Sequence, residues 1–308
     1  MKYGNRNIKH NDMIIGCLYA LGCETLYGLS YMFTKQATEM ASEFMLLSWR
    51  FIISVLIMKV LIICGIMKID IRKKNIKPIM MVALFSPCMY FIAETVGISH
   101  TTSSESGVFL ACIPVASMIA STLILKKKPS KLQMTGILIT LAGVVITVFS
   151  VDISSSMSKI GYISLFVAVV SYALYCTFVE KASDFDGAEI TYIMLVSGAI
   201  LFTILAVTET VLNGNVSQFI TLPFREKSFL MAILYQGIGC SVAAFFLSNE
   251  AISKIGVNRT SSFIGVATVV SILAGAVFLK EKFTAYQFIG AIIIISGVYI
   301  SNFKYRTD

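Results

Sequence analysis

The chain has 308 residues, of which 56% are hydrophobic and 14% are charged, whereas an ordinary soluble domain carries about 25% charged residues. A chain of this length cannot enclose so much apolar surface, so the composition excludes a water-soluble globule and indicates a membrane protein. The net charge of +8 does not indicate a nucleic-acid partner, because membrane proteins gather Lys and Arg in their cytoplasmic loops.

Apolar runs bounded by charged or turn-rich stretches predict an all-α membrane protein with ten transmembrane helices of roughly 20 residues each. In chain order the runs cover residues 13–34, 44–66, 78–99, 105–125, 132–151, 160–180, 188–210, 229–252, 260–279 and 284–303. The first run is too long for the apolar region of a signal peptide and carries Glu24 at its centre. We therefore expect it to stay in the protein as a helix.

The Lys and Arg residues predict that both termini lie in the cytoplasm. With the N-terminus inside, the inner segments hold 17 of the 25 basic residues and the outer segments hold six. The bias comes mostly from the first half, where the split is 12 to 2; the second half gives 5 to 4, and its loop at 181–189 is acidic. High Lys and Ile content and the lack of a targeting segment favour a bacterial inner membrane.

The sequence repeats itself at a shift of 154 residues, which superposes residues 123–146 on 277–300. The matched pairs include Gly136 with Gly290, Gly143 with Gly297, and Phe91 with Phe245. Residues 1–155 and 156–308 are thus predicted to be duplicates of five spans each, which together form one domain. Because five is odd, the second copy is inverted in the membrane. Inverted repeats are typical of secondary transporters, whose substrate site lies between the halves; channels and scaffolds built by duplication are the alternative.

Five motifs lie in the order expected for one known family. They are LYGLSYMFTK (26–35), WRF (49–51), Pro114, SYALY (171–175) and FLKEKFTAYQFIGAIIIISGVYI (278–300). Over nearly the whole chain they resemble the drug/metabolite transporter superfamily, of the EamA type. The resemblance implies ten helices in two inverted five-helix repeats, a central cavity, and export of small metabolites, amino acids or drugs by alternating access.

Two positions depart from the pattern of that family. Tyr27 stands where a Trp is usual, and Lys127 replaces the usual acidic residue after the fourth helix, which Glu281 retains in the second half. The last helix of each half carries glycines seven residues apart on one face; in the related family these helices lie at the periphery and can support a homodimer.

Glu24 is the first candidate for a functional site. An ionisable side chain at the bilayer centre costs about 2.5–3.5 kcal/mol on insertion scales, so it normally faces a cavity or a partner. Tyr27, Gly28 and Tyr31 follow Glu24 at helical spacing and share its face. We expect this polar, partly aromatic stripe to line a cavity; the alternative is a hydrogen bond to a neighbouring helix.

Glu94 is the second candidate, with Tyr90 four residues before it and Pro87 seven residues before it. Pro87 removes one backbone donor, so the helix is expected to kink beside the cavity. The alternative is that Glu94 reaches the outer membrane interface.

Arg50 lies beside Trp49, the single tryptophan of the chain. We expect it to form a structural ion pair with Glu24 or Glu94, and binding of an anion is the alternative. Lys59 is half a turn away from Arg50 around the same helix and is expected to extend to the inner interface.

Tyr172, Tyr175 and Gln236 could donate hydrogen bonds to a substrate, although side chains of this kind in membrane helices often serve packing instead. The sequence contains no Walker loop, G-x-S-x-G, H-E-x-x-H or C-x-x-C-H motif. We therefore expect no catalytic residues, metal or cofactor, and no enzyme. The leading hypothesis is a secondary active transporter of a small molecule, with protons as a candidate coupling ion. The alternatives are a facilitative uniporter and a membrane receptor or scaffold that does not transport.

Overall fold

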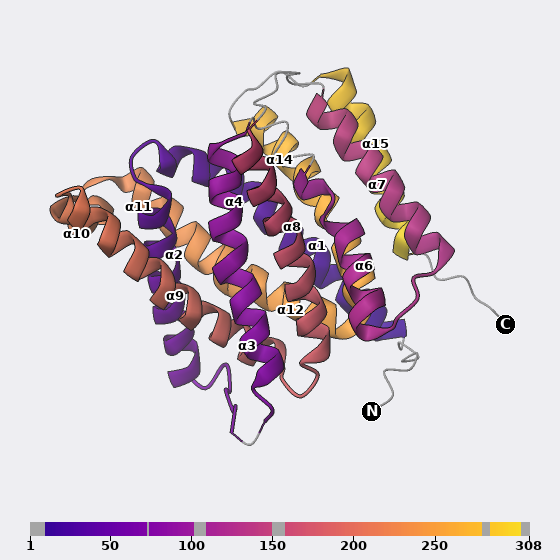
Figure 1. Ribbon diagram of the computed structural model, residues 1–308, viewed down its shortest axis with the longest axis horizontal. Helices are drawn as coiled ribbons and strands as arrows, with labels where there is room; N and C mark the ends of the chain where they lie inside the picture. Colours follow the sequence, from indigo (N-terminus) through magenta and orange to yellow (C-terminus); the bar gives the residue numbers. More distant parts are fainter. Residues whose placement is uncertain (1–9, 73, 102–108, 150–157, 279–283, 303–308) are drawn as a thin grey trace.

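The computed structural model describes residues 10–72, 74–101, 109–149, 158–278 and 284–302. Within these ranges the secondary structure is entirely helical (Figure 1). The first half contains α1 (His10–Thr38), α2 (Glu43–Ile63), α3 (Lys77–Ala83), η1 (Leu84–Met89), α4 (Tyr90–Ser99), α6 (Ile113–Leu125) and α7 (Lys131–Phe149). The second half contains α8 (Lys159–Lys181), α9 (Gly187–Leu212), α10 (Val216–Arg225), α11 (Lys227–Leu234), η2 (Tyr235–Ala243), α12 (Ala244–Ile255), α13 (Val257–Ser262), α14 (Ile264–Phe278) and α15 (Ala285–Asn302).

Eight helical segments in the described ranges are long and apolar enough to cross a membrane. They are Asn11–Thr38, Glu43–Ile63, Lys77–Ile98, Lys159–Lys181, Gly187–Leu212, Lys227–Ile255, Val257–Gly275 and Ala285–Asn302. The predicted runs at 105–125 and 132–151 coincide with two shorter apolar helices, Phe109–Leu125 and Lys131–Thr147. The chain is therefore an integral, multi-pass membrane protein, as its composition predicts.

The third helix of the first half is broken, as Pro87 predicts. Between α3 and α4, Ser86 has the extended backbone angles φ −144° and ψ 124°, and the turns around it are the wide turns of a π-helix, η1. The corresponding helix of the second half contains a second π-helical segment, η2, which was not expected. Two glycines in it, Gly237 and Gly239, are poor residues for a regular helix interior.

Helix α10 was also not expected, because it is too short to stand out as an apolar run. Leu222 of this helix is buried, whereas the apolar side chains of Phe224 and Ile220 are exposed. The indole Nε1 of Trp49 donates to the carbonyl of Phe219 at 3.0 Å, and the two rings stack. Trp49 thus attaches this helix, which protrudes at the left of Figure 1, to α2. A short helix of this kind suits the membrane interface.

The helices α7 and α15 pack side by side at one flank of the bundle (Figure 1). A Cβ added to Gly136 would lie 2.4 Å from the backbone nitrogen of Ser301 and 2.6 Å from the carbonyl oxygen of Gly297. One added to Gly290 would lie 2.8 Å from the carbonyl oxygen of Gly143. The two helices are therefore antiparallel and in backbone contact. The glycine faces, which the resemblance connected with dimers, are occupied within one chain.

We expect Gly297→Ala to lower the thermal stability of the detergent-solubilised protein. Alanine is the better helix former by roughly 1 kcal/mol, but its Cβ would lie 2.5 Å from the backbone nitrogen of Thr140. The helices would have to separate, and overpacking of this kind costs about 1–3 kcal/mol. The melting temperature, followed by intrinsic fluorescence, measures the loss.

The matched control is Gly239→Ala, because a Cβ at Gly239 meets nothing closer than the Tyr235 ring at 3.6 Å. This control should keep the wild-type melting temperature or raise it slightly. An unchanged melting temperature in Gly297→Ala would contradict the close contact between α7 and α15.

Candidate functional site

The residues singled out from the sequence come from both halves and fall on helices that contact one another. Helix α1 contacts η2 and α12, α2 contacts η2, and α8 contacts α4 and α12. The site residues on these elements are Glu24, Tyr27, Arg50, Tyr90, Glu94, Tyr172, Tyr175 and Gln236. Tyr31 also lies on α1, but its side chain is outside the described part of the structure.

Glu24 is deeply buried without a partner from the protein. The residue is 5% exposed, and in the described part of the chain its carboxylate makes no hydrogen bond or ion pair. Solvent nevertheless reaches it, since the sealed, unpartnered polar atoms of the described residues are Ser117 Oγ, Arg259 Nε and Asn302 Oδ1. Tyr172 and Tyr175 of α8 lie within electrostatic range. The carboxylate therefore faces α8 from a position that is buried but not closed to solvent.

Glu94 and Tyr90 share one face of α4, as their four-residue spacing predicts. The Tyr90 hydroxyl donates to Glu94 Oε1 at 2.6 Å. The ring of Tyr90 meets that of Tyr172 edge-on, with 5.2 Å between centroids, and Tyr172 meets Tyr175 in the same way at 5.3 Å. Aromatic side chains thus connect the Glu94 carboxylate of the first half with α8 of the second half.

Arg50 is 7% exposed, and its surroundings differ from those expected. Its Nε donates to Ser241 Oγ on η2 at 2.6 Å, and its guanidinium carbon lies 4.9 Å from the ring centroid of Phe91. Among the described residues neither Glu24 nor Glu94 approaches it within the 4.0 Å of an ion pair. The expected ion pair is not formed, because the π-helical break places a hydroxyl beside Nε and the guanidinium is directed among aromatic rings.

Two of the predicted hydrogen-bond donors are used within the protein. The Tyr175 hydroxyl donates to Asn249 Oδ1 at 2.8 Å, and Gln236 Nε2 donates to Thr34 Oγ1 at 2.9 Å. Tyr175 and Gln236 are each 2% exposed. Both side chains hold helices together, which is the alternative that their residue types left open, whereas Tyr172 is only partly buried.

Gly28 does not share the surroundings of Glu24. A Cβ added to it would lie 2.6 Å from Val270 and 2.7 Å from the carbonyl oxygen of Ala267. Gly28 therefore lets α1 approach α14 closely. The stripe predicted along α1 is divided: Glu24 faces α8, Gly28 faces α14, and Tyr27 is partly buried within electrostatic range of Arg50.

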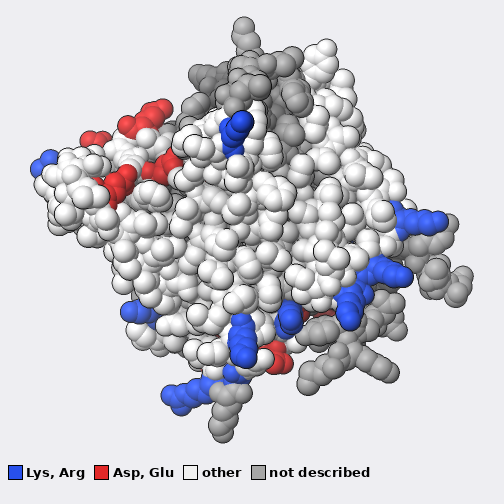
Figure 2. Space-filling model, viewed as in Figure 1, with Lys and Arg blue, Asp and Glu red and all other residues white. Residues whose placement is uncertain are grey.

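Sequence reasoning missed two ion pairs between the halves. Figure 2 shows Lys and Arg side chains along the lower edge of the molecule, and two lysines that the sequence assigns to inner segments form these pairs. Lys74 pairs with Glu189 at 2.6 Å, and Lys127 pairs with Glu180. Glu180 Oε2 also accepts from the backbone N–H of Val257 at 2.8 Å. The acidic stretch at 181–189 is the signal that could have indicated these contacts.

Glu250 of α12 accepts a hydrogen bond from the backbone N–H of Gly187 at 2.9 Å. Its carboxylate therefore caps the first turn of α9.

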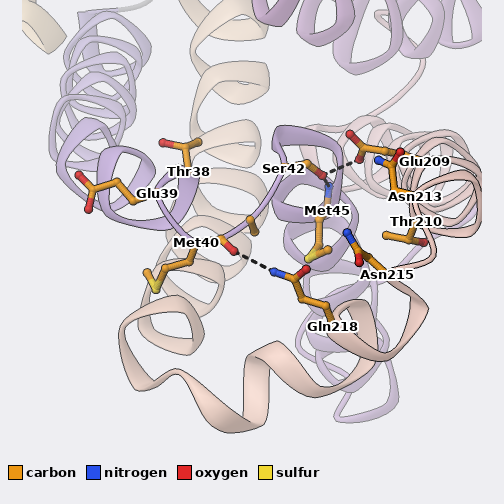
Figure 3. A pocket seen from close by; sticks show the side chains of 11 residues that line it. Thr38, Glu39, Met40, Ser42, Met45, Glu209, Thr210, Asn213, Asn215 and Gln218 are labelled. Carbon is orange, nitrogen blue, oxygen red and sulfur yellow. Dashed lines mark hydrogen bonds between the residues drawn. The ribbon is translucent and has the colours of Figure 1, made fainter.

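At the N-terminal end of α2 there is a polar pocket of about 280 Å³ between α1, α2, α9 and α10 (Figure 3). Ser42 Oγ donates to Glu209 Oε2 at 2.5 Å across it, and Gln218 Nε2 donates to the carbonyl of Met40 at 3.3 Å. None of the residues proposed from the sequence lines this pocket.

Comparison with known families decides the class of the protein. The EamA-like transporter family matches residues 14–149 and again residues 159–303. The chain belongs to the EamA-like transporter family. This confirms the resemblance drawn from the motifs, so the protein is a membrane transporter of the drug/metabolite transporter superfamily.

Individual relatives of this EamA-like chain are also named transporters. A Bacillus subtilis (strain 168) protein named "Uncharacterized transporter YcxC" is 34% identical over 301 residues, which cover 96% of this chain and 95% of that protein. The "Probable amino-acid metabolite efflux pump" of Escherichia coli (strain K12) is 21% identical over 175 residues, 56% of this chain and 58% of that protein. A solved structure with 16% identity and a TM-score of 0.74 covers 92% of this chain and 95% of its own, so the fold is shared.

We expect Tyr175→Phe to lower the free energy of unfolding of this EamA-like protein by about 1–3 kcal/mol, because it leaves the buried Asn249 Oδ1 without its donor. Tyr172→Phe is the matched control, since the Tyr172 hydroxyl has no hydrogen-bond partner among the described residues. Melting curves in detergent measure both variants. An equal loss of stability in the two would contradict the structural role of Tyr175.

Proposed function

We propose that this transporter is a secondary active exporter of a small metabolite, amino acid or drug, which works by alternating access between two inverted five-helix halves. The observation that carries the proposal is a pair of opposite charges, Glu24 and Arg50, each more than nine-tenths buried. Charged side chains within a membrane are costly and normally face a partner or a cavity. No ion pair in the described part of the chain neutralises either charge, so a small ligand or an ion is their expected partner.

Helix packing supports the inverted repeat. Helix α1 packs on α12 and α14, α8 packs on α4 and α6, and α2 packs on α9. A shift of 154 residues relates α1 to α8, α4 to α12, α6 to α14 and α2 to α9. The contacts of α1 thus correspond to those of α8, and the α2–α9 contact corresponds to itself. The glycine contacts follow the same rule, because the Gly136–Gly297 contact becomes the Gly290–Gly143 contact. The two separate matches to the EamA-like family favour the same division into residues 1–155 and 156–308.

The position of Arg50 supports a site between the halves. Phe91 and Phe245, which the shift superposes, lie 6.5 Å apart between ring centroids. Two equivalent residues in contact must flank the axis that relates the halves. The guanidinium of Arg50 lies over both rings, so its charge is beside that axis. Transporters built from inverted repeats bind substrate there, next to broken helices in corresponding positions, and η1 and η2 are such a pair.

Alternating access requires the halves to close on one side while they open on the other. The pairs Lys74–Glu189 and Lys127–Glu180 join the halves. With both termini cytoplasmic, as the Lys and Arg distribution favours, these pairs close the cytoplasmic side of a bacterial plasma membrane. The Escherichia coli relative is named a "Probable amino-acid metabolite efflux pump", and this name supports export of a metabolite.

Glu24 is the residue that we assign to coupling. Its carboxylate has no partner among the described residues, so it can bind a proton in one state and release it in the other. A facilitative uniporter would need no such exchange, and a receptor would bind ligand without moving it. The first experiment is therefore a screen of amino acids, nucleosides, sugars and organic cations for thermal stabilisation of the purified protein.

We expect Glu24→Gln to abolish pH-driven transport while leaving the melting temperature near that of the wild type, because the amide keeps the shape but cannot exchange a proton. A stabilising compound from the screen is loaded into proteoliposomes, and its radiolabelled flux is measured with and without a pH gradient. Glu39→Gln, at an exposed acid near the end of α1, is the matched control.

Full pH-driven flux in Glu24→Gln would refute the role of Glu24. Flux in the wild type that ignores the pH gradient would identify a uniporter. Binding with no flux would identify a receptor and overturn the proposed transport mechanism.

A further inference from the structure

Arg50 carries hydrogen-bond donors that the protein leaves unused. An arginine has five N–H donors in a planar fork, and the one on Nε is occupied by Ser241 Oγ at 2.6 Å. The four on the Nη groups have no partner among the described residues. These Nη atoms are also not completely buried. The completely buried side-chain polar atoms without a partner in the described ranges belong to Ser117, Arg259 and Asn302. The free edge of this 7% exposed side chain is thus buried but not closed to solvent.

Three aromatic rings lie near this guanidinium. The guanidinium carbon lies 4.9, 5.6 and 6.0 Å from the ring centroids of Phe91, Phe51 and Phe245. Aromatic faces attract the cation but accept hydrogen bonds poorly. They also exclude water, which strengthens the attraction between Arg50 and any anion that enters. The site is therefore apolar around the charge, and its Nη groups lack an acceptor among the described residues.

The local charges limit which anion fits. Glu94 lies within electrostatic range of Arg50 but does not pair with it. With one acid near the cation, the site disfavours a dianion such as phosphate and accepts one negative charge at Arg50. The Glu94 carboxylate favours a substrate that also carries an amine or another hydrogen-bond donor.

We propose that Arg50 anchors the carboxylate of the substrate, end-on through its two Nη groups, with Ser241 as the residue that positions the fork. This inference rests on the proposed transport function and assigns a chemical class to its substrate: small carboxylic acids with one negative charge, zwitterionic amino acids included. Arginine is suited to the task because its planar fork matches the two oxygens of a carboxylate.

The test compares acids with amides of the same skeleton on the purified full chain. The probes are L-phenylalanine with L-phenylalaninamide, 3-phenylpropionate with 3-phenylpropanamide, and inorganic phosphate as the other anion. Thermal stabilisation is titrated for each. The acids should bind at least about tenfold more tightly than their amides, the difference expected for hydrogen bonds to a charged group, and phosphate should not stabilise the protein.

Variants assign the effect to Arg50. Arg50→Gln should weaken the binding of both acids at least about tenfold and leave amide binding unchanged. Ser241→Ala keeps the charge but frees the fork, so its acid affinity should lie between those of the wild type and Arg50→Gln. Lys59→Gln removes an exposed cation from the same helix and should change nothing. Should Arg50→Gln fail to fold, Ser241→Ala and the acid–amide comparison still decide the question.

Three results would overturn the carboxylate anchor: equal binding of acids and amides, acid binding that survives in Arg50→Gln, or no stabilisation by either acid. Transport is judged separately, by counterflow into proteoliposomes. Flux of a compound whose binding is the same in the wild type and in Arg50→Gln would support the transport function and contradict the anchor. Acid binding that depends on Arg50 but produces no flux would keep the anchor and overturn the transport function.

Discussion

Polar groups within a bilayer find no water, so each must be satisfied inside the protein, and this constraint shapes the bundle. In the broken helix η2, Ser54 Oγ donates to the backbone carbonyl of Gly237 at 3.0 Å. The Tyr235 hydroxyl of η2 donates to the backbone carbonyl of Leu26 on α1 at 3.0 Å. Tyr175 is satisfied by Asn249. The groups of Glu24 and Arg50 that remain unpaired in the described ranges stand out because nearly everything around them is paired.

The frame follows the repeat, and the charged site departs from it. Glycines recur in both halves where α7 meets α15. At the site, the repeat partners of Glu24, Arg50 and Glu94 are Phe178, Ile204 and Ser248. The first half therefore supplies the charges, whereas the second supplies hydroxyl and amide groups such as Ser241 and Asn249. A symmetric scaffold with an asymmetric centre is the arrangement that the proposed mechanism needs, because two similar halves would move against each other while only one of them carried the charges.

Sequence reasoning located the apolar helices and the break at Pro87, because hydropathy and a missing N–H are local properties. It also found the face shared by Tyr90 and Glu94. The partner of Arg50 and the interior role of Tyr175 could not be derived, since periodicity orders the faces of one helix without saying which helix stands opposite. The π-helical turns of η2 add to the difficulty, because they rotate the residues that follow relative to a regular helix.

Two acids of the second half lie on the side that the basic residues mark as cytoplasmic. They are Glu180 and Glu189. Both are bound: Glu189 to Lys74 and Glu180 to Lys127, which replaces the acid usual in the family. Glu180 also accepts from the N–H of Val257 at the start of α13, where the helix dipole favours a negative charge. These two acids, at the end of α8 and the start of α9, therefore contribute to the contact between the halves on that side.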